Sequence, residues 1–374
     1  MTFFCSLPWR AVDVGFAGQA KPCCKFKPAE SHTVATYFDS AELRQVKQAL
    51  LSGAVPGQCR QCQAEEAVSG HSLRIMTEQA HSCQDQIRQQ AQSEQYSCIS
   101  ELAISTSNRC NLLCLPCTDG PSYARSRELQ RMGLAKYTPQ LLSNSLQVDQ
   151  IPNLDQLESV TLLGGEPFAD PETLRITDQL INSGHSGHIH LLLNTNLTLI
   201  QRETLEHLQA NFQRVTIKAS IDGTGQVNEY LRYPAQWSQI EQAVDLIQEL
   251  ALPLLIVTTI SNLSLIRYNQ VIAWAEARGI QDLFMAKVMY PAVLRFDRIS
   301  PALQQQLEHR YTQLLAQYQG MDRTRFLIET CLEIVRGSAA TPEQHAETRA
   351  WLARHDQHRG TCYQAIWPEF DQYE

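Results

Sequence analysis

The sequence of 374 residues predicts an α/β core, preceded by a small cysteine-rich module and followed by a helical extension. Apolar segments of strand length alternate with segments of helical periodicity through the middle of the chain, a pattern typical of a parallel sheet. Cysteines gather in two groups with metal-ligand spacing, and the last part of the chain is largely helical in pattern. We place the module at residues 1–98, the core at 99–298 and the extension at 299–374.

The N-terminal module contains a first group of cysteines. Cys5 and Cys23 are followed by the pair Cys59 and Cys62, which has C-x2-C spacing. Four cysteines of this kind can close a metal site completely, and both zinc and a [4Fe–4S] cluster satisfy that chemistry. Cys24 directly follows Cys23, so the spacing leaves open which of the two is the ligand. The Gln-rich stretch 84–95 predicts a solvated helix that connects the module to the core.

The core begins with an apolar segment, residues 102–104, and a second group of cysteines. Cys110, Cys114 and Cys117 have C-x3-C-x2-C spacing. Three neighbouring thiolates bind a metal, and both zinc and a [4Fe–4S] cluster need a fourth ligand. No fourth protein ligand lies close by in the sequence. This leaves one position open to a small molecule, as a catalytic cluster requires.

Further strands alternate with helices along the core. The strands are predicted at 159–163, 188–196, 214–221, 252–261 and 283–289. The intervening helices are predicted at 201–211, 237–250 and 268–278.

Polar residues end these strands. Because parallel strands direct their carboxyl ends to one edge, the polar ends predict a site there. The first of the strands runs into Gly164, Gly165, Glu166 and Pro167, where glycines allow a ligand close to the backbone and a carboxylate can accept hydrogen bonds from an ammonium group. An ordinary strand-ending turn is the alternative. The later strand ends carry Asn194, Asn196, Ser220, Asp222, Thr259 and Ser261.

The extension predicts three helices, at 302–319, 322–336 and 342–354. Ser300-Pro301 and Thr341-Pro342 are suitable starts, because proline is favoured in the first helical turn.

The composition and charge pattern predict an intracellular protein that does not bind nucleic acid. The formal charge is −8, with 39 acidic against 31 basic residues, and the basic residues are scattered rather than gathered in a stripe. No apolar run long enough for a membrane span and no signal-like opening occur. We expect a cytoplasmic protein that binds neither membrane nor nucleic acid.

The ordered motifs of the core resemble those of the radical S-adenosylmethionine (SAM) superfamily. The resemblance implies a partial (β/α)6 TIM-like barrel in which Cys110, Cys114 and Cys117 hold a [4Fe–4S] cluster. In that family the amino and carboxylate groups of SAM chelate the fourth iron. Electron transfer into SAM then releases a 5′-deoxyadenosyl radical, which abstracts a hydrogen atom from the substrate.

The same resemblance implies which residues contact SAM. The Gly-Gly-Glu-Pro motif binds the methionine end, and the polar strand ends face the cofactor. The segment around Arg232 resembles a subgroup in which this arginine pairs with the SAM carboxylate. By its own chemistry Arg232 could equally be a surface residue with its stem on Tyr233. The implied SAM contacts are Gly164, Gly165, Glu166, Pro167, Asn194, Asn196, Ser220, Asp222, Arg232 and Thr259.

The N-terminal cysteines resemble the twitch or SPASM-like module that carries an auxiliary [4Fe–4S] cluster. That module usually follows the barrel, whereas here it precedes it. The resemblance implies an auxiliary cluster, held by Cys5, Cys23, Cys59 and Cys62, that assists electron transfer. It also implies an external electron donor such as flavodoxin or ferredoxin. The substrate is either a small polar metabolite or a peptide or protein side chain.

A non-enzymatic protein is the alternative function. In that interpretation both cysteine groups bind zinc and stabilise a binding or scaffold protein. Iron uptake distinguishes the two.

Overall fold

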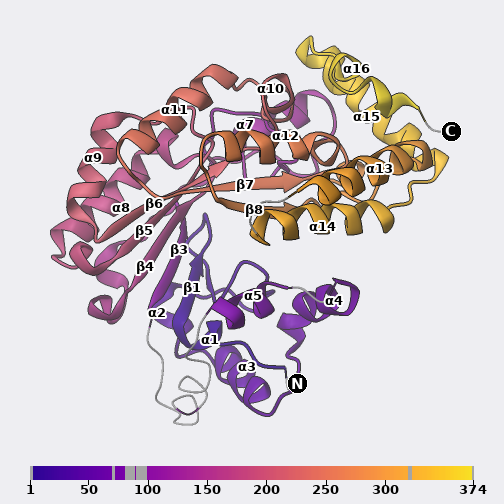
Figure 1. Cartoon of the computed structure of the whole chain (residues 1–374). Helices are drawn as coiled ribbons and strands as arrows, with labels where there is room; N and C mark the ends of the chain where they lie inside the picture. Colours follow the sequence, from indigo (N-terminus) through magenta and orange to yellow (C-terminus); the bar gives the residue numbers. More distant parts are fainter. Residues whose placement is uncertain (1–2, 70–71, 81–88, 90–98, 319–321, 373–374) are drawn as a thin grey trace. The chain divides into compact units, whose positions relative to one another are not determined.

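The computed structural model describes residues 3–69, 72–80, 89, 99–318 and 322–372. The chain has a mixed α/β fold, which confirms the predicted class (Figure 1). It divides into two compact units, each assembled from separate segments. The first unit comprises 1–108, 141–193 and 205–215, and the second comprises 109–140, 194–204 and 216–374.

Parallel strands form the sheet of the first unit. β3 (Glu101–Ser105) pairs with β4 (Ser159–Leu163), and β4 pairs with β5 (His190–Thr195), most of which belongs to this unit. On the other side of β3 lies β1 (Ala11–Val14), also parallel, and β2 (Ala20–Lys21) pairs antiparallel with β1. The N-terminal module therefore adds two strands to this sheet, and the sequence pattern did not predict either of them.

Two helices of the first unit, α8 (Pro171–Asn182) and α9 (Arg202–Asn211), each bury one side. Asp170 caps α8, since its carboxylate accepts a hydrogen bond from the Glu172 amide, and Pro171 fits the first helical position. α9, close to the predicted range, buries Leu205 and Leu208.

The N-terminal residues build a hydrophobic cluster of their own. Its buried members include Phe4, Trp9, Phe26, Val46 and Leu50, and two of the cysteines predicted as ligands pack against it. Trp9 stacks on Phe4 with ring centroids 5.5 Å apart. The helices that supply or surround this cluster are α1 (Leu7–Arg10), α2 (Val34–Tyr37), α3 (Ala41–Leu51), α4 (Arg60–Ser69) and α5 (Leu73–Ala80) (Figure 1).

The ends of β3 and β4 are locked together by short backbone contacts. The Thr106 amide donates to the Leu163 carbonyl at 2.8 Å, and the Gly165 amide donates to the Ser107 carbonyl at 2.7 Å. A Cβ atom on Gly164 would lie 2.5 Å from the Ser107 carbonyl oxygen. Only glycine therefore fits at position 164 without a shift of backbone.

In the second unit, β7 (Leu254–Ile260) pairs in parallel with β8 (Asp282–Lys287) and with β6 (Arg214–Ser220). All three strands were predicted, and their observed ends lie within about two residues of the expected ones. Between them come α10 (Gln226–Leu231), α11 (Trp237–Glu249) and α12 (Ser264–Ala277).

The C-terminal residues are helical, as predicted. α13 (Pro301–Gln317) and α14 (Asp322–Arg336) lie side by side (Figure 1). α15 (Pro342–Arg359) continues past the predicted end at 354, because its terminating residue is Gly360 with a φ of +70°. α16 (Tyr363–Ile366) follows. The predicted Gln-rich helix at 84–95 lies outside the described residues, apart from Gln89.

Buried polar side chains connect α15 with α7 (Tyr123–Arg131) in the second unit. His355 is fully buried, and its Nδ1 lies 2.8 Å from the Trp351 carbonyl, which can only accept. Its Nε2 is therefore unprotonated and accepts from Arg125 Nη2 at 2.9 Å. Burial and the charge of Arg125 lower the pKa of His355 to about 3.

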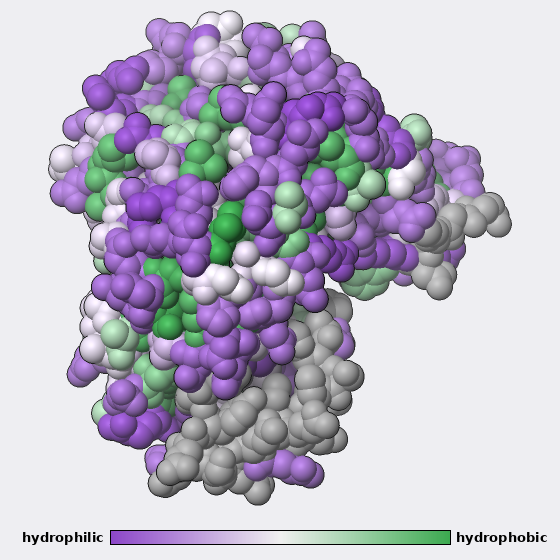
Figure 2. All heavy atoms as spheres, turned by 90° about the vertical axis from the view of Figure 1, so that its left-hand side faces the viewer, coloured by the Kyte–Doolittle hydropathy of each residue, from purple (hydrophilic) through white to green (hydrophobic). Residues whose placement is uncertain are grey.

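Hydrophilic side chains predominate on the face drawn in Figure 2, with hydrophobic ones in small groups between them. None of the helices in the described part of the chain has both the length and the apolar character needed to cross a membrane.

We expect Gly164→Ala to lower the free energy of unfolding by about 1–3 kcal/mol, because the new methyl group overlaps the Ser107 carbonyl oxygen. Urea unfolding measures this. Gly187→Ala is the matched control, since a Cβ atom at this position meets nothing within 4 Å. Equal effects of the two substitutions would contradict the steric explanation.

We expect His355 to make the protein less stable in mild acid. Between pH 6.5 and about 3 the unfolded chain binds a proton at this residue and the folded chain does not, so stability falls as the pH falls. The loss from pH 6.5 to 5 is at most about 2 kcal/mol. His355→Gln should reduce this pH dependence in urea unfolding, whereas His358→Gln, on the exposed side of the same helix, should leave it unchanged.

Candidate functional site

The loop with the C-x3-C-x2-C spacing, residues 110–117, follows β3 in the chain and belongs to the second unit. Its backbone pairs with a segment that follows α10. The Leu113 amide donates to the Tyr233 carbonyl at 2.6 Å, and the Leu115 amide donates to the Leu231 carbonyl at 2.8 Å. Leu115 of the loop is fully buried. This cysteine loop is therefore tied to residues on both sides of Arg232.

Cys117 lies within electrostatic reach of both other cysteines of the loop. The pKa of Cys117 is raised to about 12, mainly by burial and to a smaller extent by the nearby Cys114 and Cys110. Burial also raises the pKa of Cys114, while Arg232 acts in the opposite direction. Thiolates in such surroundings need a compensating positive charge, and a bound iron–sulfur cluster supplies one. The donor set therefore fits the cluster that the resemblance implies.

Arg232 is held by a buried carboxylate. Its Nε lies 2.9 Å from Oδ2 of Asp222, which is 1% exposed. The other carboxylate oxygen of Asp222 accepts from the Thr259 amide at 2.7 Å, and the Asp222 amide donates to Asn228 Oδ1 at 3.0 Å. The ends of β6 and β7 and the predicted arginine thus form one network. The surface alternative for Arg232 does not hold, because the residue is buried.

The end of β5 reaches the cysteine loop through amide side chains. Asn196 Nδ2 donates to Asn111 Oδ1 at 3.0 Å, and Asn111 Nδ2 donates to Thr198 Oγ1 at 2.7 Å. Asn194 Oδ1 is a buried atom for which the described residues provide no hydrogen-bond partner. A buried amide oxygen without a partner is where a ligand with a polar hydrogen would be stabilised. Sequence reasoning named both strand-end asparagines but did not single out Asn111.

Two further strand-end residues were predicted. The Ser261 hydroxyl accepts a hydrogen bond at 3.1 Å from the amide of Ser264, the first residue of α12. Ser220 is half-buried at the last position of β6.

The Gly-Gly-Glu-Pro motif belongs to the first unit, at the end of β4. Glu166 is 1% exposed, and its Oε1 accepts a hydrogen bond from the Phe168 amide at 3.2 Å. Pro167 opens the short 3-10 turn Pro167–Ala169. The carboxylate thus lies at the end of a strand, as predicted, where it also caps this turn.

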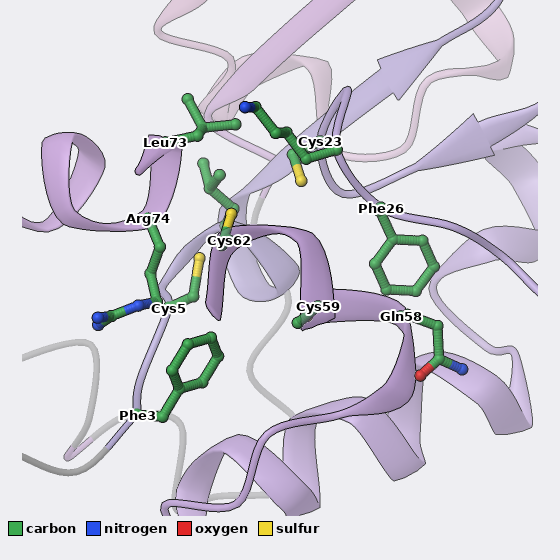
Figure 3. A pocket seen from close by; sticks show the side chains of 11 residues that line it. Phe3, Cys5, Cys23, Phe26, Gln58, Cys59, Cys62, Leu73 and Arg74 are labelled. Atoms are coloured by element: carbon green, nitrogen blue, oxygen red, sulfur yellow. The ribbon is translucent and has the colours of Figure 1, made fainter. Parts of the chain in front are cut away.

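The N-terminal cysteines line one pocket within the first unit. Cys5, Cys23, Cys59 and Cys62 all contribute to its wall, and Figure 3 shows the sulfur atoms of Cys5, Cys23 and Cys62 turned toward the same space. Cys24 is exposed and is not part of the wall. The structure therefore favours Cys23 as the member of the pair that faces the pocket. Apolar side chains complete most of the lining: Phe3, Leu7, Phe26 and Leu73.

Burial governs the chemistry of these thiols as well. It raises the pKa of Cys23 to about 12 and that of Cys59 to about 11, and Cys62 adds to the second shift. Arg74 and Lys25 also line the pocket. Four thiol donors with nearby cations suit a metal or cluster that stabilises the thiolate form. Across the described ranges, no three His, Cys, Asp or Glu side chains as they stand form a group that could hold a metal ion.

Sequence reasoning missed a layer of charged residues around the cysteine loop. Arg125 and Glu128 are spaced three apart on α7, and Arg359 ends α15; all three are buried or nearly so. The i, i+3 spacing of the first two was a visible signal, but their link to Arg359 was not.

Comparisons with known proteins bear on residues 104–266, which match the family model described as "Radical SAM superfamily". No curated protein matches the chain. Among solved structures, native anSMEcpe with bound AdoMet is 17% identical, with a TM-score of 0.43. That likeness covers 58% of this chain and 60% of anSMEcpe, so this chain spans about three fifths of its length.

A second solved structure is Streptococcus suis SuiB bound to S-adenosylmethionine. It is 16% identical, with a TM-score of 0.40, and the likeness covers 82% of this chain and 67% of SuiB. The family match spans the cysteine loop, the Gly-Gly-Glu-Pro motif and the polar ends of β5, β6 and β7. The similarity of this chain to the radical SAM superfamily model therefore extends over residues 104–266.

Proposed function

We propose that the protein is a radical SAM enzyme whose cluster is held by Cys110, Cys114 and Cys117. The observation that carries the proposal is the grouping of three partly buried thiols on one loop that lacks a fourth cysteine, within the matched residues. When bound, the [4Fe–4S] cluster supplies the electron that cleaves SAM reductively, and the resulting radical abstracts a substrate hydrogen. The chain itself holds the cluster, orients SAM and excludes water.

The SAM contacts that we propose come from the strand ends. Glu166 would accept hydrogen bonds from the methionine ammonium, which its buried carboxylate suits. Asn194 would pair its buried amide oxygen with a donor of the ligand. Arg232, held by Asp222, keeps a positive charge beside the cysteine loop for the SAM carboxylate. The remaining proposed contacts are Gly164, Gly165, Pro167, Asn196, Ser220, Asp222 and Thr259.

A second, auxiliary [4Fe–4S] cluster is our proposal for the N-terminal pocket. Its ligands would be Cys5, Cys23, Cys59 and Cys62, with small rotations of the thiol side chains on loading. Because cysteines would occupy all four positions, the cluster would move electrons rather than bind substrate. We retain 1–98, 99–298 and 299–374 as the auxiliary, core and C-terminal segments of this proposal.

The substrate that we propose is a small polar molecule or a peptide or protein side chain. Solved structures of anSMEcpe with a Kp18Cys peptide and of SuiB with its precursor peptide SuiA provide a reason to include peptides in a substrate screen. An external donor of the flavodoxin or ferredoxin type would deliver the electron.

We expect the anaerobically reconstituted protein to bind about eight irons per chain, as two [4Fe–4S] clusters require. Ala in place of Cys110, Cys114 and Cys117 should remove four of them, and so should Ala in place of Cys5, Cys23, Cys59 and Cys62. Iron and sulfide analysis measures this, and Cys331→Ala, which changes a buried thiol of the second unit, is the control.

Other iron counts are equally informative. Four irons that all disappear with the first triplet would remove the auxiliary cluster from the proposal and leave the enzyme. Stoichiometric zinc without iron uptake would favour the scaffold protein.

We expect the reduced, reconstituted protein to convert SAM to 5′-deoxyadenosine and methionine, and Cys114→Ala to abolish this conversion. Chromatography of the products measures it. Asp222→Asn should reduce it at least tenfold, because Arg232 loses its ionised partner and its orientation. Absence of 5′-deoxyadenosine from a fully iron-loaded wild type, with candidate substrates present, would refute the enzymatic proposal.

A further inference from the structure

Two buried arginines from distant parts of the chain meet on one carboxylate in the second unit. Arg359 donates to both oxygens of Glu128, with Nε to Oε1 and Nη2 to Oε2 each at 2.7 Å. Arg125 Nη1 donates to Glu128 Oε2 as well. Arg125 and Glu128 are 1% and 2% exposed. Burial of two guanidinium groups with one carboxylate costs desolvation free energy, and it leaves one positive charge in excess of the negative one.

Each arginine also reaches the backbone of the cysteine loop. Arg359 Nη2 donates to the Leu113 carbonyl, and Arg125 Nε lies 3.4 Å from the Cys117 carbonyl oxygen. The two carbonyls lie on either side of Cys114. The two guanidinium groups therefore hold the loop backbone at Leu113, next to Cys114, and at Cys117.

The charge of this group does not cancel. Burial alone would raise the pKa of Glu128, but the hydrogen bonds and charges of Arg359 and Arg125 outweigh it and lower the pKa to about 2. Glu128 therefore carries one negative charge at neutral pH. His355, which accepts from Arg125, is neutral because its pKa is lowered to about 3. Two positive charges against one negative charge leave this group of three residues with one net positive charge, and solvent screens buried charges little.

The excess positive charge lies against the loop itself, since Arg359 donates to the Leu113 carbonyl and Arg125 Nε lies 3.4 Å from the Cys117 carbonyl oxygen. A buried positive charge at such a distance favours the more negative form of a group that is bound to the sulfur atoms of this loop. The reduced cluster is more negative than the oxidised one by one electron, which the external donor supplies.

We propose that Arg125 and Arg359 are positioning residues that raise the reduction potential of the cluster on Cys110, Cys114 and Cys117. This inference depends on the proposed function. Net charge and hydrogen bonds around the ligands are known determinants of cluster potentials. Arg232 and Asp222 form a pair of opposite charges, whereas the Arg125, Arg359 and Glu128 group has one more positive than negative charge.

The test is a potentiometric titration of the reconstituted protein, monitored by electron paramagnetic resonance. The relevant signal is the one that is absent when the three cysteines are replaced by Ala. Arg125→Met should shift its midpoint potential to lower values, whereas Arg125→Lys, which keeps the charge, should stay close to wild type. Glu128→Gln should shift the midpoint to higher values, because it removes a negative charge. Arg127→Met is the matched control, an exposed arginine of the same helix, and should cause no shift.

The sign of the shift separates an electrostatic role from a merely structural one. An unchanged midpoint in an iron-replete Arg125→Met protein would overturn the inference. So would shifts of the same sign in Arg125→Met and Glu128→Gln. If Arg125→Met fails to retain iron, the direction of the Glu128→Gln shift decides. Absence of a cluster on the three cysteines in wild type would instead refute the proposed function.

Discussion

The removal of sulfur from water is the constraint on which the rest of the second unit depends. A buried thiol keeps its proton, and the high pKa of Cys117 shows how strongly the protein interior disfavours its thiolate. Positive groups nearby reduce that penalty, and Arg232, Arg125 and Arg359 are arranged around the cysteine loop accordingly. Buried arginines in turn need carboxylates, which Asp222 and Glu128 provide. The three sulfur atoms thus account for the arginines around them, and the arginines account for the carboxylates that pair with them.

The backbone of the cysteine loop satisfies a second requirement. A loop without regular structure would leave its amide groups unpaired, yet Leu113 and Leu115 donate to the carbonyls on both sides of Arg232. The same pairing brings the arginine beside the cysteines. The loop and Arg232 are distant in sequence, so this relation is visible only in the folded chain. The same hydrogen bonds satisfy the amide groups of the loop and place the charge of Arg232 beside the cysteines.

Local pattern was sufficient for much of the fold. β4 has the predicted bounds, because its alternate residues Val160 and Leu162 are fully buried and two glycines follow its last residue. β1 escaped prediction because it has four residues, one of them Asp13, and it is a strand only through its pairing with β3. In the site, spacing alone found the cysteines, and the strand ends marked Asn196 and Asp222. The link between Glu128 and Arg359 has no local signature, because it joins helices from opposite ends of the second unit's sequence.

The parallel pairing of β1 with β3 has a consequence for how the first unit folds. Ala11 lies opposite Glu101, so the chain must close a long loop before this ladder can form, which slows folding relative to a hairpin. Deleting the N-terminal segment would uncover the hydrogen-bonding edge of β3 and offer it to other chains. The N-terminal segment is therefore an integral part of the first unit and not an independent appended domain. The cysteines of the pocket belong to the same segment that supplies β1 and β2 to the sheet.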